Sequence, residues 1–327
     1  DSIKVTEIPS FDKIAADVSP AIPAPTTKTS LLPIEMQNLS HTEVSEICNQ
    51  LGNRSLKSIK QVYGGCIHNS WQIEIDNKKF FLKSNKRKKK FLKFEEFCLR
   101  NLQANINQEY LIIPQVISYM EVNNVELLLL EWIDMQNSNQ KSLGKGLGEM
   151  HLKSNESNPK KFGYPVEGYI GMTNQNKGWE KNWIDCFIKL RIEPQLSILK
   201  NNFLDNTTKN KISAKIKLAL IDHTPINALV HGDLWSGNIG TDQNSKGVIF
   251  DPASWWADSE VDIAMTKLFG GFKSEFYEEY HKIIPIKKGF QERVIIYNFY
   301  HILNHANMFG GSYLNQVQNY IKRIMSM

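Results

Sequence analysis

Residues 231–238 of the chain read His-Gly-Asp-Leu-Trp-Ser-Gly-Asn, and residues 250–252 read Phe-Asp-Pro. Asp233 and Asn238 are five residues apart, and Asp251 follows thirteen residues later, at the end of a short apolar segment. A carboxylate at a strand end and a carboxamide from the preceding loop can share one Mg²⁺ ion, because this hard cation takes oxygen ligands. A second carboxylate can orient a hydroxyl group and accept its proton. Each residue alone would be read as a loop cap, but together they predict Asn238 and Asp251 as metal ligands and Asp233 as a catalytic base.

The spacing of Asp233 and Asn238 is that of a kinase catalytic loop. The His-Gly-Asp form, in place of His-Arg-Asp, is typical of small-molecule kinases with a protein-kinase-like fold. A protein kinase is disfavoured, because no Asp-Phe-Gly to Ala-Pro-Glu segment follows Asp251. Phosphoryl transfer also needs backbone amides or a lysine to hold the phosphates of ATP.

A glycine turn upstream is the first candidate for phosphate binding. Gly64, Gly65 and Cys66 lie between two expected strands, where backbone amides could approach phosphate oxygens. The turn has neither the G-x-G-x-x-G pattern nor that of a P-loop, so this signal is weak on its own.

A lysine on the next strand is the second candidate. Lys83 follows the apolar residues 80–82, and Glu95 lies twelve residues later on an expected helix. We expect a Lys83–Glu95 pair that positions the α- and β-phosphates of ATP. Glu96 is an alternative partner, because the phase of the helix does not distinguish the two.

Two further features complete the expected site. Residues 128–133 end the last strand of the β-rich part, and we expect Glu131 and Ile133 to offer backbone groups to adenine. Trp235, next to the proposed base, is a candidate wall of the acceptor pocket, although tryptophans more often serve packing.

The histidines do not predict a metal cluster. We expect His231 to hold the catalytic loop by hydrogen bonds, His151 to be a satisfied core residue, and His68 to be a candidate neighbour of phosphate. Asp262 is expected to anchor the catalytic loop by accepting backbone amides.

The order of elements predicts an α+β protein with a protein-kinase-like, two-lobed fold. Residues 1–35 contain five prolines and read as a flexible leader or an added extension. Residues 36–133 are expected to form a small β-rich, ATP-binding lobe with one main helix, and residues 134–327 a larger helical lobe for catalysis and acceptor binding. The expected strands are 71–75, 80–82, 112–119 and 125–130, with turns at Asp76-Asn77 and Asn123-Asn124 and a hairpin around 239–249. The expected helices are 40–52, 89–101, 142–154, 179–199, 206–221, 261–269, 290–308 and 314–325. Ser40 and Glu43 have the spacing of a capping box that would open the first of them.

Composition excludes several other classes of protein. The chain has 327 residues, 41% of them hydrophobic and 22% charged, as in ordinary globular proteins. It contains no apolar stretch long enough to span a membrane. The net charge of +5 arises largely from residues 86–90, a run read as a solvated face, and nothing indicates a nucleic-acid partner. Four separated cysteines and the absence of a signal peptide favour the reducing cytoplasm. A monomer is expected.

With these residues in place, the chain resembles the fructosamine kinase or ketosamine-3-kinase family, which is related to aminoglycoside phosphotransferases and choline kinases. The resemblance runs from about Gln61 to Tyr320. The segments that carry it are 64–67, 143–151, 169–173, 183–191 with Gln195, 231–238, 251–253, 260–265, 268–272, 300–305 and 309–311. It implies ATP- and Mg²⁺-dependent phosphorylation of the 3-hydroxyl of ketosamines, on small amines or on glycated proteins. The phosphorylated adduct is unstable, so the implied role is deglycation, with ribulosamines and erythrulosamines expected before fructosamines.

Two departures from the family leave the choice of substrate open. Gly168 stands where the family often has asparagine, and residues 257–260 read Ala-Asp-Ser-Glu where many members read Gly-His-Arg-Glu. Both lie near motifs of the acceptor side, where Glu260 is an expected contact. The alternatives are a kinase of aminoglycoside or choline type and, in another class, an inactive nucleotide-binding or redox-sensing module.

Cys66 carries a separate hypothesis. Backbone dipoles in the phosphate loop and the nearby Lys83 would lower the pKa of its thiol. We therefore expect oxidation of Cys66, for example to a disulfide-linked dimer, to inhibit the enzyme reversibly. The alternative is a small residue that fits a tight loop.

Overall fold

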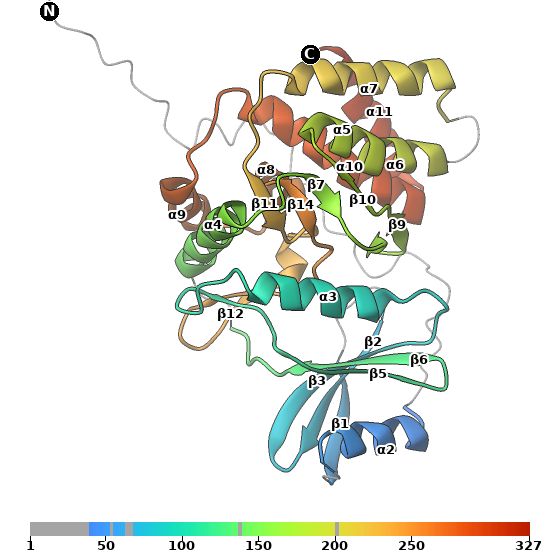
Figure 1. The fold of residues 1–327 in the computed structure, drawn as a ribbon, viewed down its shortest axis with the longest axis vertical. Helices are drawn as coiled ribbons and strands as arrows, with labels where there is room; N and C mark the ends of the chain where they lie inside the picture. Colours follow the sequence, from blue (N-terminus) through green and yellow to red (C-terminus); the bar gives the residue numbers. More distant parts are fainter. Residues whose placement is uncertain (1–38, 53–54, 63–67, 137–138, 200–202) are drawn as a thin grey trace, which may run out of the picture.

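The computed structural model describes residues 39–52, 55–62, 68–136, 139–199 and 203–327. These residues form two lobes, with the smaller one in blue to blue-green and the larger one in yellow-green to red in Figure 1. The smaller lobe is built on one antiparallel sheet and the larger lobe is mainly helical. The predicted α+β architecture with two lobes is confirmed.

The sheet of the small lobe has the strand order β1-β2-β3-β6-β5, and all neighbours are antiparallel. Its two tight turns were both predicted. Asp76 and Asn77 have φ of 48° and 61°, and Asn123 and Asn124 have φ of 51° and 65°. Asn and Asp tolerate this left-handed region, which two-residue hairpins require. The strands are β1 (Leu56–Val62), β2 (Asn69–Ile75), β3 (Lys78–Asn85), β5 (Val116–Val122) and β6 (Val125–Glu131).

Two helices accompany this sheet. Helix α2 (His41–Gln50) begins with the predicted capping box, in which Glu43 N donates to Ser40 Oγ at 3.2 Å and Ser40 N donates to Glu43 Oε2 at 2.8 Å. Helix α3 (Phe91–Gln103) lies between the sheet and the large lobe in Figure 1. Its buried face carries apolar side chains together with Glu95.

The large lobe contains a helix pair, α4 and α9, and a group formed by α8, α10 and α11. The expected single helix 179–199 is wrong in detail. Residues 178–180 form a strand, and a π turn, η1, separates α5 from α6. The sequence did not predict α9. The helices are α4 (Lys141–Glu156), α5 (Trp183–Phe187), η1 (Ile188–Ile192), α6 (Glu193–Ile198), α7 (Asn206–Leu220), α8 (Glu260–Leu268), α9 (Ser274–Ile283), α10 (Phe290–Phe309) and α11 (Ser312–Met325).

Short strands position the catalytic segments of the large lobe. They form sheets with the orders β10-β7-β14-β11, β12-β13-β4 and β8-β9. Strand β4 comes from the part of the chain assigned to the small lobe and pairs in parallel with β13, so it joins the lobes. The expected strand 112–119 is therefore two strands, separated by residues that include Pro114. The strands are β4 (Leu111–Ile112), β7 (Phe162–Tyr164), β8 (Gly168–Ile170), β9 (Thr173–Gln175), β10 (Gly178–Glu180), β11 (Asn227–Val230), β12 (Ile239–Thr241), β13 (Gly247–Ile249) and β14 (Trp255–Asp258).

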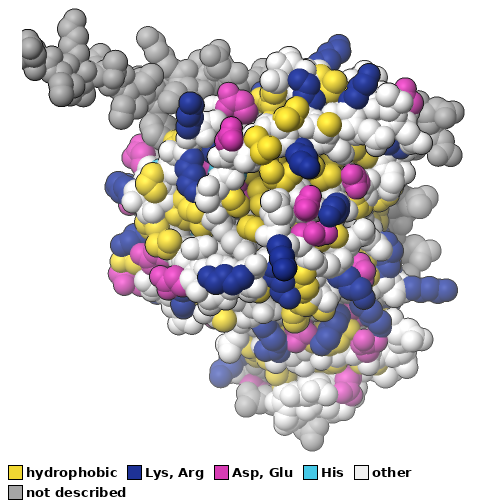
Figure 2. Space-filling view, turned by 45° about the horizontal axis from the view of Figure 1, so that its top comes forward, with side chains coloured by type: hydrophobic (Ala, Val, Ile, Leu, Met, Phe, Trp, Pro, Cys, Tyr) yellow, Lys and Arg dark blue, Asp and Glu magenta, His cyan; other side chains and the backbone are white. Residues whose placement is uncertain are grey.

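Charges of both signs alternate with apolar surface on the face drawn in Figure 2. The basic run at residues 86–90 is partly used for contacts within the protein. Lys89 Nζ donates to Asn174 Oδ1 in the large lobe at 2.6 Å, and Lys90 pairs with Glu121. Among the described residues, no helix is long and apolar enough to cross a membrane.

Candidate active site

The His-Gly-Asp segment leaves β11 and turns beneath the segment that follows Asp251. Gly232 has φ of +84°, and a Cβ atom there would lie 2.1 Å from Ala253 O. Only glycine fits this position without a shift of the backbone. The turn brings Asp233 to the cleft, and the 3₁₀ turn Ser236–Asn238 follows.

Hydrogen bonds bring Asn238 toward both aspartates. Asn238 Nδ2 donates to Asp233 O at 2.9 Å and to Asp233 Oδ2 at 3.4 Å. Phe250 N donates to Asn238 O at 3.1 Å, which holds the start of the Asp251 segment beside the catalytic loop. Asp251 itself has φ of +57°, an uncommon conformation for a residue other than glycine and one that occurs at functional sites.

Two buried residues, Asp262 and His151, hold the start of the catalytic loop through hydrogen bonds. Asp262 accepts hydrogen bonds from His231 N at 2.7 Å and Gly232 N at 2.8 Å. His151 Nε2 lies 3.1 Å from Asp262 Oδ2, and its Nδ1 lies 2.9 Å from Tyr280 OH. Both Asp262 and His151 therefore have the structural surroundings expected from the sequence.

His231 holds the loop through its ring. Asp233 N donates to His231 Nδ1 at 3.3 Å, so Nε2 carries the proton and donates to Phe250 O at 2.9 Å. Burial lowers the pKa of His231, which agrees with a neutral ring. The ring links the loop that contains Asp233 to the segment that contains Asp251.

Lys83 joins the two lobes through carboxylates. Its Nζ donates to Glu95 Oε1 at 2.8 Å and also pairs with Asp251. Glu96, the alternative partner, instead accepts from Lys93 and Arg100 at the surface. Burial favours the neutral amine of Lys83, but Asp251 and Glu95 outweigh burial and raise its pKa, so the ammonium is retained.

A cavity of about 340 Å³ contains these groups, a volume within the usual range for small-molecule sites. Lys83, Glu95, Asp233, Asn238 and Asp251 all line it. Trp235, the candidate acceptor wall, also lines it. The sequence did not identify its apolar wall, which includes Val62, Phe81, Phe91, Met135 and Tyr169. Strand alternation marks Phe81 only as half-buried, and no local pattern marks Met135.

The charges in this cavity change the ionisation of the proposed base. Burial, together with the neighbouring Asp251 carboxylate, raises the pKa of Asp233 to about 7. Burial and the positive charge of Lys83 lower the pKa of His68 to about 3, so its ring is neutral. His68 lines the cavity, whereas the preceding Gly64, Gly65 and Cys66 lie outside the described residues.

The oxygen atoms of Asn238 and Asp251 at the centre of the cavity are suitable ligands for Mg²⁺. Asn238 directs its Nδ2 to Asp233, which leaves its side-chain carbonyl oxygen for a cation. Asp251 is the adjacent carboxylate, and in this structure the Lys83 ammonium balances its charge. A carboxylate and an amide carbonyl match the oxygen preference of Mg²⁺.

The expected hinge residues flank the cavity but do not line it. Glu131, the last residue of β6, is exposed, and its N–H already donates to Gln115 O at 2.9 Å. Ile133 is half-buried, and the next residue of this segment that lines the cavity is Met135.

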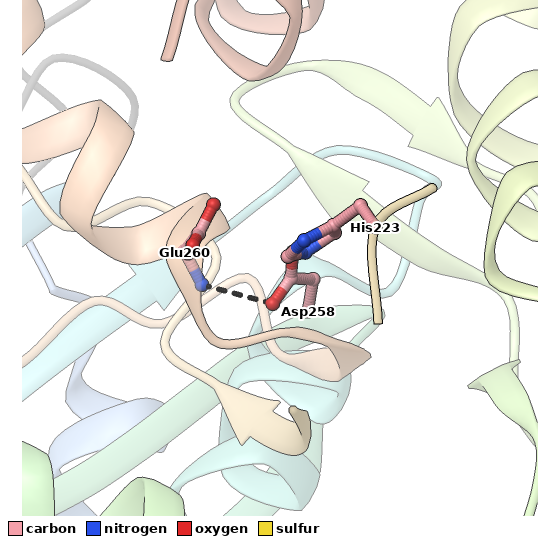
Figure 3. Close-up of side chains that lie close together, drawn as sticks. All are labelled: His223, Asp258 and Glu260. Atoms are coloured by element: carbon pink, nitrogen blue, oxygen red, sulfur yellow. Dashed lines mark hydrogen bonds and ion pairs between the residues drawn. The ribbon is translucent and has the colours of Figure 1, made fainter. Parts of the chain in front are cut away.

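Glu260 does not lie in the cavity, so its expected contact with the acceptor does not fit the structure. It is bound by Arg293, whose Nε and Nη2 donate to its carboxylate at 2.6 and 2.8 Å. Figure 3 shows Glu260 beside Asp258 and His223. Asp258 Oδ2 accepts from Tyr297 OH at 2.7 Å and lies 2.6 Å from His223 Nε2. With Arg293 on Glu260, this group is a hydrogen-bonded anchor of α8 rather than a cation site.

Comparison with solved structures defines the class of protein. A structure from Haemophilus somnus 129PT, provisionally named a fructosamine-3-kinase, has a TM-score of 0.76 at 27% identity, over 86% of this chain and 96% of that one. An aminoglycoside phosphotransferase variant solved with ADP and hygromycin B has a TM-score of 0.57 at 14% identity, over 87% of this chain and 98% of that one. The second likeness concerns the fold alone. Fold and site together define a phosphotransferase of the protein-kinase-like class.

Sequence relatives define the family. A protein of Synechocystis sp. named as a probable ketoamine kinase is 36% identical, over 81% of this chain and 90% of the relative. Mouse ketosamine-3-kinase is 30% identical over 84% and 97%, and chloroplastic protein-ribulosamine 3-kinase of Arabidopsis thaliana is 33% identical over 83% and 84%. The family model for fructosamine kinase matches residues 39–327. The chain belongs to the fructosamine kinase family.

Proposed function

We propose that this enzyme transfers the γ-phosphoryl group of ATP to the 3-hydroxyl of ketosamines on glycated lysines or small amines. The arrangement of Lys83, Asp233, Asn238 and Asp251 in one cavity carries the proposal, because it supplies the groups that phosphoryl transfer requires. The names of the mouse and Arabidopsis relatives support the ketosamine, and specifically ribulosamine, class of acceptor.

The nucleotide side of the cavity would be formed by both lobes. Lys83, positioned by Glu95, would bind the α- and β-phosphates, while Gly64, Gly65 and Cys66 would offer backbone amides. For adenine we propose the carbonyl of Glu131 and the backbone of Ile133. The N–H of Glu131 is already used by Gln115.

Asn238 and Asp251 would hold Mg²⁺, since both line the cavity. The bound ion would neutralise charge on the β- and γ-phosphate oxygens. Lys83 would then exchange its contact with Asp251 for contacts with phosphate, while Glu95 keeps it oriented.

Asp233 would orient the acceptor hydroxyl and accept its proton. Its raised pKa, about 7, suits a base that must take a proton during transfer near neutral pH. Asn238 fixes the carboxylate through Nδ2, and Trp235 would form the adjacent wall of the acceptor site. The phosphorylated ketosamine would then decompose and release the amine, which makes the reaction a deglycation.

The deciding experiment is Mg²⁺-ATP turnover with ribulosyl-lysine and fructosyl-lysine derivatives, with Asp233→Asn as the control. Turnover that is lost in the variant, with ribulosyl-lysine preferred, is the expected result. ATP binding without turnover of either compound would favour an acceptor of aminoglycoside or choline type. Absence of ATP turnover with any acceptor would favour the inactive nucleotide-binding or redox-sensing module. Sedimentation with and without reductant would test for the proposed monomer and for a disulfide-linked dimer through Cys66.

A further inference from the structure

Three neighbouring cations on the loop between β3 and α3 are not neutralised within the fold. Arg87, Lys88 and Lys89 are exposed, and none of them has a carboxylate within ion-pair distance in the part of the chain that the structure describes. Lys90, by contrast, pairs with Glu121. Adjacent charges of one sign create a positive potential, which attracts anionic groups.

A buried asparagine holds this loop in one conformation. Asn85 is only 3% exposed, and its Oδ1 accepts from Arg87 N at 3.1 Å. Its Nδ2 donates to Lys89 O at 2.8 Å and to Glu126 Oε2 at 2.6 Å. Because the backbone of the loop is already ordered, a ligand that binds there causes little further loss of conformational entropy.

Contacts with the large lobe place the loop at the rim of the cavity. Arg87 Nη1 lies 2.8 Å from the sulfur atom of Met172, and the preceding residue, Gly171, lines the cavity. Lys89 Nζ lies 5.6 Å from the centre of the Tyr169 ring, and Tyr169 also lines the cavity. The unpaired cations therefore lie beside the opening of the cavity that contains the proposed base.

The register of the small sheet shows which end of the cavity this is. On β6, Glu126 pairs with Asn85 and Glu131 pairs with Phe80, while Lys83 lies between these pairs on β3. The loop therefore begins roughly 17 Å from Glu131, the proposed adenine contact, which is the span of five residues in an antiparallel strand. A nucleotide with its adenine at Glu131 and its phosphates at Lys83 would direct its γ-phosphate, and the acceptor beyond it, toward the loop.

The proposed acceptor would bring a protein surface to the same rim. In a glycated protein, carbons C2 and C1 of the sugar, the amine nitrogen and the four-carbon stem of lysine join the reacting C3 carbon to the backbone. When the C3 hydroxyl lies at Asp233, the residues that flank the modified lysine lie at the opening of the cavity. Acidic side chains among them would be the ones that Arg87, Lys88 and Lys89 attract.

We propose that Arg87, Lys88 and Lys89 bind acidic side chains that flank the glycated lysine of a protein acceptor. This inference rests on the proposed ketosamine kinase activity, and it specifies acidic protein segments as the partner. Complementary charges at a rim mainly raise the rate of encounter, and salt screens them. The loop therefore selects among protein acceptors without acting on the transfer step.

Two ribulosyl-lysine peptides that differ only in their flanking residues test the inference. One has Asp and Glu around the modified lysine, and the other has Asn and Gln in their place. We expect the parent enzyme at low salt to have a kcat/KM about 3- to 10-fold higher for the acidic peptide, the range of two exposed ion pairs. In about 1 M salt, where the screening length falls to about 3 Å, this preference should disappear.

The double variant Arg87→Gln, Lys88→Gln should lose the preference. Its kcat/KM for the acidic peptide should fall to that for the neutral peptide, while its KM for ATP stays unchanged. The double variant Lys78→Gln, Lys79→Gln is the matched control, because it removes the same charge from exposed residues at the opposite end of β3 and should keep the preference. Equal losses on both peptides, or an equal loss in the control variant, would overturn the inference.

Reversal of charge gives an independent readout. Lys88→Glu should prefer a third peptide, with lysines around the modified residue, over the acidic one, and an unchanged order of preference would contradict the inference. Free ribulosyl-lysine separates this inference from the proposed function. Failure of the parent enzyme to phosphorylate it would overturn the proposed function. Its turnover without discrimination between the acidic and neutral peptides, whether both react equally or neither reacts, would overturn the inference alone.

Discussion

Lys83 contacts carboxylates from two separate segments, and this double pairing makes Glu95 testable against its neighbour. Glu95 is buried with Lys83, whereas Glu96 lies at the surface with Lys93 and Arg100. We expect Glu95→Gln to lower kcat/KM for ATP by about 10- to 100-fold, because the oriented ammonium loses a charged partner. Steady-state kinetics with varied ATP would measure this loss.

Glu96→Gln is the control for that measurement. It removes a carboxylate of the same type from the same helix, but only surface ion pairs of small value are lost. Equal effects of the two substitutions would mean that the Lys83–Glu95 pair has no special part in ATP use.

The cysteines provide a second test at the level of single residues. Burial raises the pKa of Cys98 and of Cys186 to about 12, so both are protonated and unreactive at neutral pH. Oxidant sensitivity should therefore arise from Cys66 or the half-buried Cys48. We expect Cys66→Ala to abolish reversible inhibition by peroxide and Cys48→Ala to leave it unchanged, as measured by activity before and after reduction. Unchanged sensitivity of Cys66→Ala would refute the redox hypothesis.

At the scale of elements, α10 carries a buried histidine whose ionisation affects stability. His301 is fully buried, and neither ring nitrogen has a hydrogen-bond partner among the described residues. Burial lowers its pKa to about 3, with His305 lowering it further and Asp262 opposing. Between pH 6.5 and 3 the unfolded chain binds a proton that the folded protein does not, so acid destabilises the fold.

This ionisation makes the free energy of unfolding depend measurably on pH. From pH 7.5 to 5.0, His301 alone should lower the free energy of unfolding by about 2 kcal/mol. We expect His301→Leu to lose that part of the pH dependence, as measured by urea denaturation at both pH values. His41→Leu, at the exposed start of α2, is the control. An identical pH dependence in His301→Leu and the parent would contradict the buried neutral state.

The elements also differ in how far the sequence determines them. Local chemistry specifies the capping box at Ser40 and the turns at Asp76-Asn77 and Asn123-Asn124, and these were predicted. Residues 179–199 follow a helical period, but pairing of β10 with β7 makes the start a strand. The π turn at Arg191 likewise has no local signal. Three-residue strands are too short to show a period of two, and tertiary pairing alone defines them.

In the site, too, local sequence determines some features and contacts between distant segments determine the others. The five-residue spacing of Asp233 and Asn238 is local, so the sequence predicted the polar centre. Which of Glu95 and Glu96 faces Lys83 depends on how α3 is rotated about its axis against the sheet, and the sequence does not show this rotation. Contacts between distant segments form the apolar wall that includes Phe81 and Met135. Such a contact, with Arg293, also holds Glu260 outside the cavity. A single sequence contains no pattern that identifies such contacts.

At the scale of the whole molecule, the site is divided between the lobes, so ligand binding should stabilise them together. Lys83 and Glu95 come from the small lobe and Asp233, Asn238 and Asp251 from the large lobe. A ligand at a hundred times its Kd raises the free energy of unfolding by about 2.7 kcal/mol when it binds only the folded state. We therefore expect Mg²⁺-ATP to raise the Tm of the parent enzyme as one cooperative transition.

Variants in each lobe separate the proposed roles in that experiment. Asp251→Asn should remove the additional stabilisation that Mg²⁺ gives beyond ATP alone, because the residue is the proposed charged metal ligand. Lys83→Met should remove most of the shift with ATP, because the phosphates lose their ammonium partner. Asp233→Asn should retain the full shift although it abolishes turnover, since the proposed role of Asp233 is to act on the acceptor hydroxyl and not on the nucleotide. A lost shift in Asp233→Asn, measured by differential scanning fluorimetry, would place Asp233 in nucleotide or metal binding and remove it from the role of base.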